Sequence, residues 1–373
     1  MTTTDLTKNH PEERRGDVAV VLGTRPEIIK LAEIIRLLGP RARVVHTGQH
    51  WDSDMAGQFF THFGIGEPDV RLEGMRGVSR GQQIARGLTE LIGHFTDAPP
   101  AAVVVQGDTN SVSAGAQAGN YLGIPVVHVE AGLRSRDRNM PEEINRLVVG
   151  AVADLHCAPT ETAAANLRAE GVQESRVIVT GNTVVESVHH TLSSMDPSRW
   201  DLPDHPYVLA TIHRPENTDD PNALRRILGT LRALGLGVVL AIHPRTAQAV
   251  RTHHLDHLLE GMDVRSGVPH DGFLALAQGA QLLVSDSGGV QEETTVLKKP
   301  LLVMRRSTER PEAIDAGFAR LVTPDDDAEA AAREMLSPEL VERLARTPSP
   351  YGDGTASARI VEATLALIES TRR

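Results

Sequence analysis

Cysteine, aromatic residues and long apolar runs are all scarce in this chain of 373 residues. The single cysteine, Cys157, excludes an intramolecular disulfide, which fits a protein of the reducing cytoplasm. Aromatic residues make up only 3% of the sequence, so any core must be built from Val, Leu, Ile and Ala. No run approaches the ~20 apolar residues of a membrane-spanning helix, so no membrane partner is expected.

An excess of positive charge is also missing. The formal net charge is −11, which argues against a nucleic-acid partner because such proteins need a basic face. A local cationic pocket for a small anion remains compatible with that charge. Residues 1–16 are polar, lack the apolar stretch of a signal peptide and are predicted to be a mobile tail. We expect Cys157 to be a buried thiol rather than a nucleophile.

Short β-branched runs alternate with helical patterns through most of the chain. Runs such as 18–23 are almost continuously apolar, as expected for strands covered on both faces. This alternation predicts an α/β fold with two Rossmann-like, doubly wound parallel sheets. The rhythm restarts at residue 207, after a stretch rich in Pro, Asp and Ser that we interpret as a linker around 186–205. The predicted domains are 17–188 and 205–355.

Ligands of doubly wound sheets bind where strands end, so the loops after the strands are the candidate sites. The loop "GTRPEIIK" (23–30) follows the first strand, and Gly23 permits a tight turn there. The helix that follows presents its N-terminus to an anion, and Arg25 and Lys30 could add charge. In the alternative, both are solvated surface residues. The usual dinucleotide and P-loop fingerprints are absent.

Carboxylates follow later strands of the first domain. Asp108 either acts in the site or caps the next helix. Glu130 ends a buried strand, where a lone carboxylate is costly unless paired or used. Glu142 and Glu143 occupy a first helical turn, where the helix dipole stabilises acids. This effect explains the presence of Glu143 but does not explain a carboxylate at Glu130. Four arginines close by in sequence can pair with carboxylates or phosphates: Arg134, Arg136, Arg138 and Arg146.

In the second domain, two successive strands end in His and Arg. His213 and His243 can donate hydrogen bonds to phosphate or transfer a proton, although a lone strand-end histidine is usually structural. The "HHLDH" stretch (253–257) has no further ligands at a matching spacing, so no metal site is predicted.

The sequence "SDSGG" (285–289) follows another short apolar run. Ser287, Gly288 and Gly289 form a loop whose N–H groups can approach a diphosphate, with a helix N-terminus behind them. Glu292 or Glu293, one turn on, could accept hydrogen bonds from a ribose diol. Further candidates for binding the phosphate charge are Arg305, Arg306 and Arg310. Phe273 either stacks on a base or packs in the core.

Together these loops resemble the UDP-N-acetylglucosamine 2-epimerases, in particular the non-hydrolysing bacterial and archaeal type. The resemblance runs from about residue 18 to about 322. The motifs that carry it are "GTRPEIIK", "TGQHWDSDM", "QGDTNS", "HVEAGLRS", "MPEEINR", "APTET", "TGNT", "IHRPEN", "IHPRT", "SDSGGVQEE" and "TERPEA".

The resemblance implies a glycosyltransferase-B type fold with an interdomain cleft. It also implies a homodimer, UDP held mainly by the second domain, no cofactor, and a C-terminal helix, 356–371, that crosses back to the first domain. Matching motif to motif, the catalytic residues would be Asp108, Glu130, Glu142 and His213. The substrate-binding residues would be Arg25, Lys30, Arg146, His243, Phe273, Ser287, Gly288, Gly289, Glu293 and Arg310.

Some members also bind a second UDP-sugar as an activator, partly through the loop that here contains Gln49 and His50. Trp51 and Asp52 follow, where many bacterial members carry Arg-Glu. Arg306 stands where relatives often have an acidic or amide residue.

The implied reaction is C2 epimerisation of UDP-GlcNAc to UDP-ManNAc, through elimination of UDP to a 2-acetamidoglucal and re-addition, as a step of aminosugar metabolism. The nearest alternative is the hydrolysing 2-epimerase, which releases ManNAc and UDP. A glycosyltransferase and a UDP-sugar sensor are further alternatives.

Overall fold

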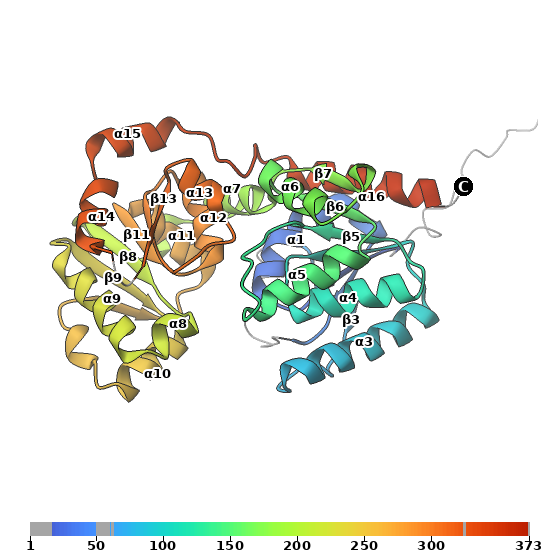
Figure 1. Cartoon of the computed structure of the whole chain (residues 1–373), viewed down its shortest axis with the longest axis horizontal. Coiled ribbons are helices and arrows are strands. Elements are labelled where there is room, and N and C mark those ends of the chain that lie inside the picture. Colours follow the sequence, from blue (N-terminus) through green and yellow to red (C-terminus); the bar gives the residue numbers. More distant parts are fainter. Residues whose placement is uncertain (1–16, 50–59, 61–62, 324–325, 372–373) are drawn as a thin grey trace, which may run out of the picture. The chain divides into compact units, whose positions relative to one another are not determined.

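The computed structural model describes residues 17–49, 60, 63–323 and 326–371 (Figure 1). The predicted tail, 1–16, lies outside this part of the chain. The chain divides into two compact units. Unit 1 comprises Met1–Ser187 and Gly354–Arg373, and unit 2 comprises Val188–Asp353. Each unit contains one parallel sheet covered by helices, which confirms the predicted class of two doubly wound α/β domains.

Unit 1 is built on a seven-stranded parallel sheet in the order β3-β2-β1-β4-β5-β6-β7. Its strands are β1 (Val18–Leu22), β2 (Ala42–His46), β3 (Val70–Arg71), β4 (Ala102–Gln106), β5 (Val126–Val129), β6 (Leu155–Ala158) and β7 (Val177–Val179). Its helices are α1 (Arg25–Leu38), α3 (Arg80–Asp97), α4 (Asn110–Tyr121), α5 (Pro141–Val152), α6 (Glu161–Ala169) and α16 (Ala356–Thr371), with 3-10 turns η2 (Gly39–Arg41) and η3 (Glu174–Arg176).

Alternate residues of the central strand β1 explain the two layers of helices in unit 1. Val18, Val20 and Leu22 pack with α1 and α16 on one face. Ala19 and Val21 pack with α3, α4 and α5 on the other face. Because both faces are covered, the strand is apolar throughout, which is why its sequence lacks a polar alternation.

Unit 2 is built on a six-stranded parallel sheet in the order β10-β9-β8-β11-β12-β13. Its strands are β8 (Tyr207–Thr211), β9 (Gly237–Ile242), β10 (Asp263–Ser266), β11 (Leu282–Ser285), β12 (Leu301–Met304) and β13 (Ala319–Val322). Its helices are α8 (Pro215–Thr218), α9 (Pro221–Ala233), α10 (Pro244–Thr252), α11 (His270–Gly279), α12 (Gly288–Leu297), α13 (Pro311–Asp315), α14 (Ala328–Met335) and α15 (Pro338–Arg346), with 3-10 turns η4 (Pro197–Arg199) and η5 (Asp256–Leu258).

The expected linker at 186–205 includes the boundary between the two units and begins inside a helix. Helix α7 (Val184–Ser194) crosses the boundary between the units. Its residues Val185 and Val188 are buried, which gives the segment one apolar face and favours a helix. The Pro- and Asp-rich composition that suggested a linker is concentrated after Ser194.

Sheet topology places the site in each unit. In unit 1 the strand order reverses between β1 and β4, and in unit 2 it reverses between β8 and β11. Loops that leave the carboxyl ends of two such strands run to opposite faces and leave room for a ligand. The predicted site residues follow these strands or their neighbours. Among the described helices, none is long and apolar enough to cross a membrane.

Candidate functional site

Asp108 lies in the loop after β4 and is held by an arginine. Its Oδ2 lies 2.9 Å from Nε and 2.6 Å from Nη2 of Arg146, which is buried on α5. The cap of α4 is Thr109, whose hydroxyl accepts the N–H of Val112. The capping alternative for Asp108 is therefore wrong. The Asp108 carboxylate is partly exposed, so it is positioned by a cation and accessible from solvent.

Glu130 follows β5 and is buried in a left-handed backbone conformation with φ 63°. Its Oε2 forms an ion pair with Lys30 of α1 and accepts a hydrogen bond of 3.1 Å from Asn182. Non-glycine residues in this conformation store strain that usually serves a site. Lys30, predicted as an anion ligand, is therefore a direct partner of a predicted catalytic acid.

Glu142 and Glu143 occupy the first turn of α5 but differ in environment. Glu142 is exposed and has no hydrogen-bond or ion-pair partner among the described residues. Glu143 is buried, accepts the N–H groups of Ser135 and Arg136, and lies 2.7 Å from Nη1 of Arg146. Burial alone would raise the pKa of Glu143, but these hydrogen bonds outweigh it and lower the pKa. Glu143 thus fixes the loop before α5, and Glu142 is left accessible.

The first turn of α1 carries a buried acid that we did not predict. Glu27 accepts hydrogen bonds from the Gly23 N–H, the Thr24 hydroxyl and the Thr109 hydroxyl. Burial raises the pKa of Glu27 to about 7, against the opposing effect of these donors. Glu27 therefore ties the loop after β1 to the loop after β4, at the point where the strand order reverses.

Gly23 is required for a different reason from the one we expected. Its φ is not among the positive values, so the loop does not need a left-handed residue there. A Cβ at Gly23 would instead overlap the hydroxyls of Thr47 and Ser111, which hydrogen-bond each other at 2.7 Å. Gln49 joins the same cluster by accepting the Ser111 N–H at 2.9 Å. Arg25 is exposed at the start of α1.

His50, the second residue of the predicted activator site, lies outside the described residues. Of the two predicted activator residues, the structure therefore places only Gln49, which contacts Ser111.

In unit 2, His213 follows β8 and contacts Asp286, which follows the adjacent strand β11. The His213 N–H donates to both carboxylate oxygens at 3.1 Å, and its Nδ1 lies 3.2 Å from Oδ1. Asp286 is fully buried and also accepts from the Arg214 N–H and from Asn217. Burial lowers the pKa of His213, Asp286 opposes that shift, and the neighbouring His243 and arginines add to it.

His243 caps α10 through Nδ1, which accepts the Arg245 N–H at 3.2 Å. Its ring centroid lies 5.4 Å from that of His213. The two predicted strand-end histidines are therefore neighbours. Arg245 turns away from them toward Asp219, at 2.8 Å.

The turn at Ser287–Gly289 forms the start of α12, as the glycines predict. A Cβ at Gly288 would lie 2.6 Å from Nη1 of Arg310, whereas a Cβ at Gly289 would meet nothing nearer than 3.9 Å. Gly288 thus allows the Arg310 guanidinium to lie against the turn. Arg310 is buried and held by Glu292, 2.6 Å from its Nε, and by Glu309. One helix N-terminus and one cation meet at this turn.

The two acids of α12 are distinguished by their partners. Glu292 is fully buried against Arg310. Glu293 is half-buried, and its Oε1 lies 2.9 Å from Nε2 of His270. Of the two, Glu293 is therefore the more accessible candidate for a ribose hydroxyl. Phe273, on the first turn of α11, is half-buried rather than part of the buried core, which disfavours the core-packing alternative.

Comparison with known proteins decides the family. A family model described as UDP-N-acetylglucosamine 2-epimerase matches residues 39–365. The chain belongs to this family. The resemblance seen in the motifs is thereby confirmed, and the chain is assigned to the isomerases.

Individual members of the UDP-N-acetylglucosamine 2-epimerase family match almost the whole chain. The UDP-N-acetylglucosamine 2-epimerase of Methanocaldococcus jannaschii is 37% identical over 92% of this chain and 97% of its own length. A UDP-2,3-diacetamido-2,3-dideoxy-D-glucuronate 2-epimerase from Pseudomonas aeruginosa is 34% identical over 92% and 98%, respectively.

A solved structure of the M. jannaschii family member, in complex with UDP-GlcNAc and UDP, matches with a TM-score of 0.84 and 36% identity. The match covers 94% of this chain and 99% of that chain. The predicted glycosyltransferase-B type fold of two Rossmann-like domains is therefore correct.

Two further positions in the site were missed at the level of sequence. Glu27 is indistinguishable from an ordinary first-turn acid, because nothing in "RPEIIK" signals that its side chain points inward. Asp286 precedes the glycine turn, and its position directly after a buried strand was the available signal. Both are buried acceptors that link two loops.

Two remaining predictions concern cysteine and metals. Cys157 is buried on β6, so the prediction of a buried thiol is confirmed, and burial raises its pKa to about 12. Within the described ranges, no group of three or more His, Cys, Asp or Glu side chains could hold a metal ion. His253, in the "HHLDH" stretch, lies instead 3.3 Å from the Thr218 carbonyl.

Proposed function

We propose that the chain interconverts UDP-GlcNAc and UDP-ManNAc by elimination and re-addition of UDP. The observation that carries this proposal is the placing of two carboxylates, Asp108 and Glu130, after adjacent strands, each held by a separate cation. Inversion at C2 needs a proton removed from one face of the sugar and returned to the other. Two acids on different loops suit that requirement better than one.

In the proposed first step, a carboxylate takes the C2 proton. The C2–H electron pair forms the C1–C2 double bond, and the bond from C1 to the β-phosphate oxygen breaks. The products are UDP and 2-acetamidoglucal. Re-addition reverses these changes, with the proton delivered to the opposite face of C2. We assign proton transfer to Asp108 and Glu130, with Glu142 assisting as an accessible acid.

Departure of UDP requires stabilisation of the diphosphate. We propose that the turn at Ser287, Gly288 and Gly289, with Arg310 beside it, binds this anion. His213 would hold or protonate the phosphate, and His243 would lie next to it. Support comes from the contact of Arg310 with the turn and from the nearness of the two rings.

The residues that bind the rest of the substrate are proposed from the solvent accessibility of their side chains. We propose that Glu293 accepts from the ribose and that Phe273 contacts the uracil, since both side chains are half-buried. Arg25, Lys30 and Arg146 complete the set, the last two by holding the acids as well as by supplying charge.

The test is incubation with UDP-GlcNAc in D2O, followed by NMR of the anomeric protons. We expect UDP-ManNAc with deuterium at C2, and glucal in trace amounts. Product that keeps protium at C2 would contradict elimination. Release of free UDP and ManNAc in proportion to turnover would assign the hydrolysing reaction instead. A parallel incubation with UDP-2,3-diacetamido-2,3-dideoxy-D-glucuronate tests the substrate of the Pseudomonas relative.

The site assignment has its own test in Asp108→Asn. We expect kcat to fall by roughly a hundredfold or more, the usual effect of losing a general acid or base. Because Asn keeps the shape and one acceptor for Arg146, the fold should be unchanged. Full activity in this variant would remove Asp108 from the mechanism.

We also propose a homodimer, a cytoplasmic location, and activation by a second UDP-sugar near Gln49 and His50. Light scattering on the purified chain tests the dimer, and cell fractionation tests the location. A sigmoidal dependence of initial rate on UDP-GlcNAc, lost in Gln49→Ala, tests the activator site.

A further inference from the structure

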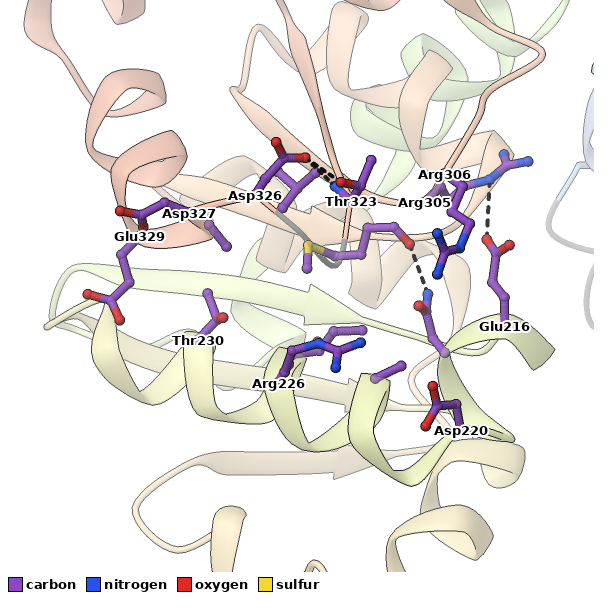
Figure 2. A pocket seen from close by; sticks show the side chains of 16 residues that line it. Glu216, Asp220, Arg226, Thr230, Arg305, Arg306, Thr323, Asp326, Asp327 and Glu329 are labelled. Atoms are coloured by element: carbon purple, nitrogen blue, oxygen red, sulfur yellow. Dashed lines mark hydrogen bonds and ion pairs between the residues drawn. The ribbon is translucent and has the colours of Figure 1, made fainter.

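Unit 2 contains a cavity of about 280 Å³ that is lined by none of the residues given a role in the proposed function. Arg305 and Arg306, which the sequence offered as candidates for the phosphate charge, line this cavity. It lies between α8 and α9 on one side and the ends of β12 and β13 with the start of α14 on the other (Figure 2). This position is at the carboxyl ends of parallel strands, where sheets of this class bind ligands.

A buried arginine in the cavity wall has two donor atoms without a hydrogen-bond acceptor among the described residues. The side chain of Arg305 is only 2% exposed, and its Nη2 lies 2.9 Å from Oε2 of Glu309. Nε and Nη1 of Arg305 have no hydrogen-bond partner among the described residues, since Glu216 lies 3.9 Å from Nε. Buried donors of charged groups are rarely left unpaired. We therefore expect a ligand that supplies a hydrogen-bond acceptor to these two donor atoms.

The closer of the two carboxylates that face Arg305, Glu309, is shared. Glu309 also forms an ion pair with Arg310 and lies 3.8 Å from Arg214. Glu309 is thus divided among three arginines, although Arg310 also pairs with the buried Glu292, and Glu309 compensates the charge of Arg305 only in part.

Two more arginines line the same cavity. Arg226, on α9, and Arg306, next to Arg305, are exposed and have no hydrogen-bond or ion-pair partner in the described part of the chain. Their guanidinium groups are available to a ligand without breaking an existing contact.

The acids that line the cavity lie at both of its ends. At the arginine end, Oε1 of Glu216 lies 3.9 Å from Nε of Arg305, and Asp220 caps α9 by accepting the Asn222 N–H. Asp326 accepts the N–H and the hydroxyl of Thr323, and Asp327 caps α14 by accepting the Ala330 N–H. In Figure 2, Asp326, Asp327 and Glu329 lie at the opposite end of the cavity from Arg305 and Arg306. The open donors at this end belong to Arg305 and Arg306, and the carboxylate of Glu216 lies beside Arg305.

We propose that this cavity is a second ligand site, for a small phosphate-bearing molecule whose phosphate is bound by Arg226, Arg305 and Arg306. Three guanidinium groups suit a phosphate dianion better than a single carboxylate. Apolar side chains complete the wall and can contact an organic portion of the ligand: Ala223, Ile227, Met304, Val322 and Ala328. The proposal goes beyond the proposed function and does not depend on it.

The test is calorimetric titration of the full chain with inorganic phosphate and, separately, with glycerol 3-phosphate, in phosphate-free buffer at constant ionic strength. UDP is titrated first and kept saturating, so that the turn at Ser287–Gly289 is filled. Failure of UDP to bind would count against the proposed function, and it is seen before the second ligand is added. We expect saturable binding of at least one phosphate probe.

The double variant Arg226→Gln/Arg306→Gln should bind the phosphate probe roughly tenfold or more weakly, because charged hydrogen bonds are lost. The matched control is Arg225→Gln/Arg251→Gln, which removes the same charge from exposed positions outside the cavity. It should bind as the parent does. Arg305→Lys, which keeps the charge but not the planar fork, should also bind more weakly.

The two probes separate the sources of the phosphate. Tighter binding of glycerol 3-phosphate assigns the site to a phosphate monoester that also contacts the apolar wall, and equal binding assigns it to free phosphate. The proposal is overturned if neither probe binds, if the double variant binds as tightly as the parent, or if the control loses as much affinity as the double variant.

Discussion

The Nδ1 atom of His213 lies 3.2 Å from Oδ1 of Asp286, and the same carboxylate accepts the His213 backbone N–H. Asp286 therefore fixes both the loop after β8 and the orientation of the imidazole. Because the carboxylate lies beside Nδ1, Nε2 is the ring nitrogen left for a substrate. Because Asp286 is completely buried and directly follows the neighbouring strand, the ring is positioned from the end of that strand rather than by its own loop.

Asp286→Asn should weaken both folding and catalysis. The free energy of unfolding should fall by about 1.5–3 kcal/mol, because buried hydrogen bonds to a charged acceptor are lost. The Asp286 carboxylate raises the pKa of His213, so its removal should shift the titration of the His213 ring protons, followed by NMR, to lower pH. An unchanged titration midpoint would show that Asp286 has only a structural role.

The two glycines of the 287–289 turn should respond differently to alanine. In Gly288→Ala the new Cβ would lie 2.6 Å from Nη1 of Arg310, so the guanidinium must move and UDP affinity should drop roughly tenfold or more. In Gly289→Ala the Cβ meets open space, and folding stability should rise by up to about 1 kcal/mol, the usual effect in a helix. Calorimetric UDP titrations and urea unfolding measure the two effects. Equal loss of affinity in both variants would contradict the role of Arg310.

Glu27 should make the stability of the chain depend on pH. Its folded pKa of about 7 lies above its ordinary value of 4.5, so the folded state binds the proton more tightly. The resulting stabilisation is complete below pH 4.5 and is lost as the pH rises through about 7. It amounts to at most about 3 kcal/mol.

Glu27→Gln, which mimics the protonated acid, should remove this dependence. Urea unfolding of both chains at pH 5 and pH 8 gives the comparison, in which the histidines that titrate in the same range cancel. A parent and variant that lose stability equally between these two pH values would show that Glu27 is ionised throughout.

The neighbouring acids of α5 should separate catalysis from folding. Glu143→Gln should destabilise the chain by about 1–3 kcal/mol, because its buried oxygens accept two backbone N–H groups and pair with Arg146. Glu142→Gln should leave the unfolding free energy within about 0.5 kcal/mol, since the side chain is exposed. Its effect should appear in kcat instead. Thermal unfolding and epimerase assays of both variants provide the check, and a destabilised, fully active Glu142→Gln would reverse the assignment.

The central strands could be predicted from sequence, and the edge strands could not. β1, β4, β8 and β11 are covered on both faces, so their sequences are apolar runs that stand out. β3 is only two residues long, and β10 reads "DVRS" with mostly exposed side chains. Edge strands of this kind are defined by their hydrogen bonds to a neighbour, which leave no pattern in the local sequence.

The site residues that could be predicted from sequence are those that follow a strand. Asp108, Glu130 and His213 were found because each follows an apolar run. The partners of these residues were not found, because pairs such as Lys30 with Glu130 join positions 100 residues apart. A single sequence without structure contains no information on which of many cations meets which acid.

Helix α16 has a consequence for the order in which the chain acquires its structure. Ile360 and Ile368 complete the unit 1 core beside α1, yet the ribosome adds them only after every residue of unit 2. At roughly 5–20 residues per second, unit 1 waits on the order of ten to thirty seconds for its last helix. During that interval the apolar face of α1 is uncovered. Unit 2, which is continuous in sequence, has no such delay, so the half of the protein that is made first is expected to mature last.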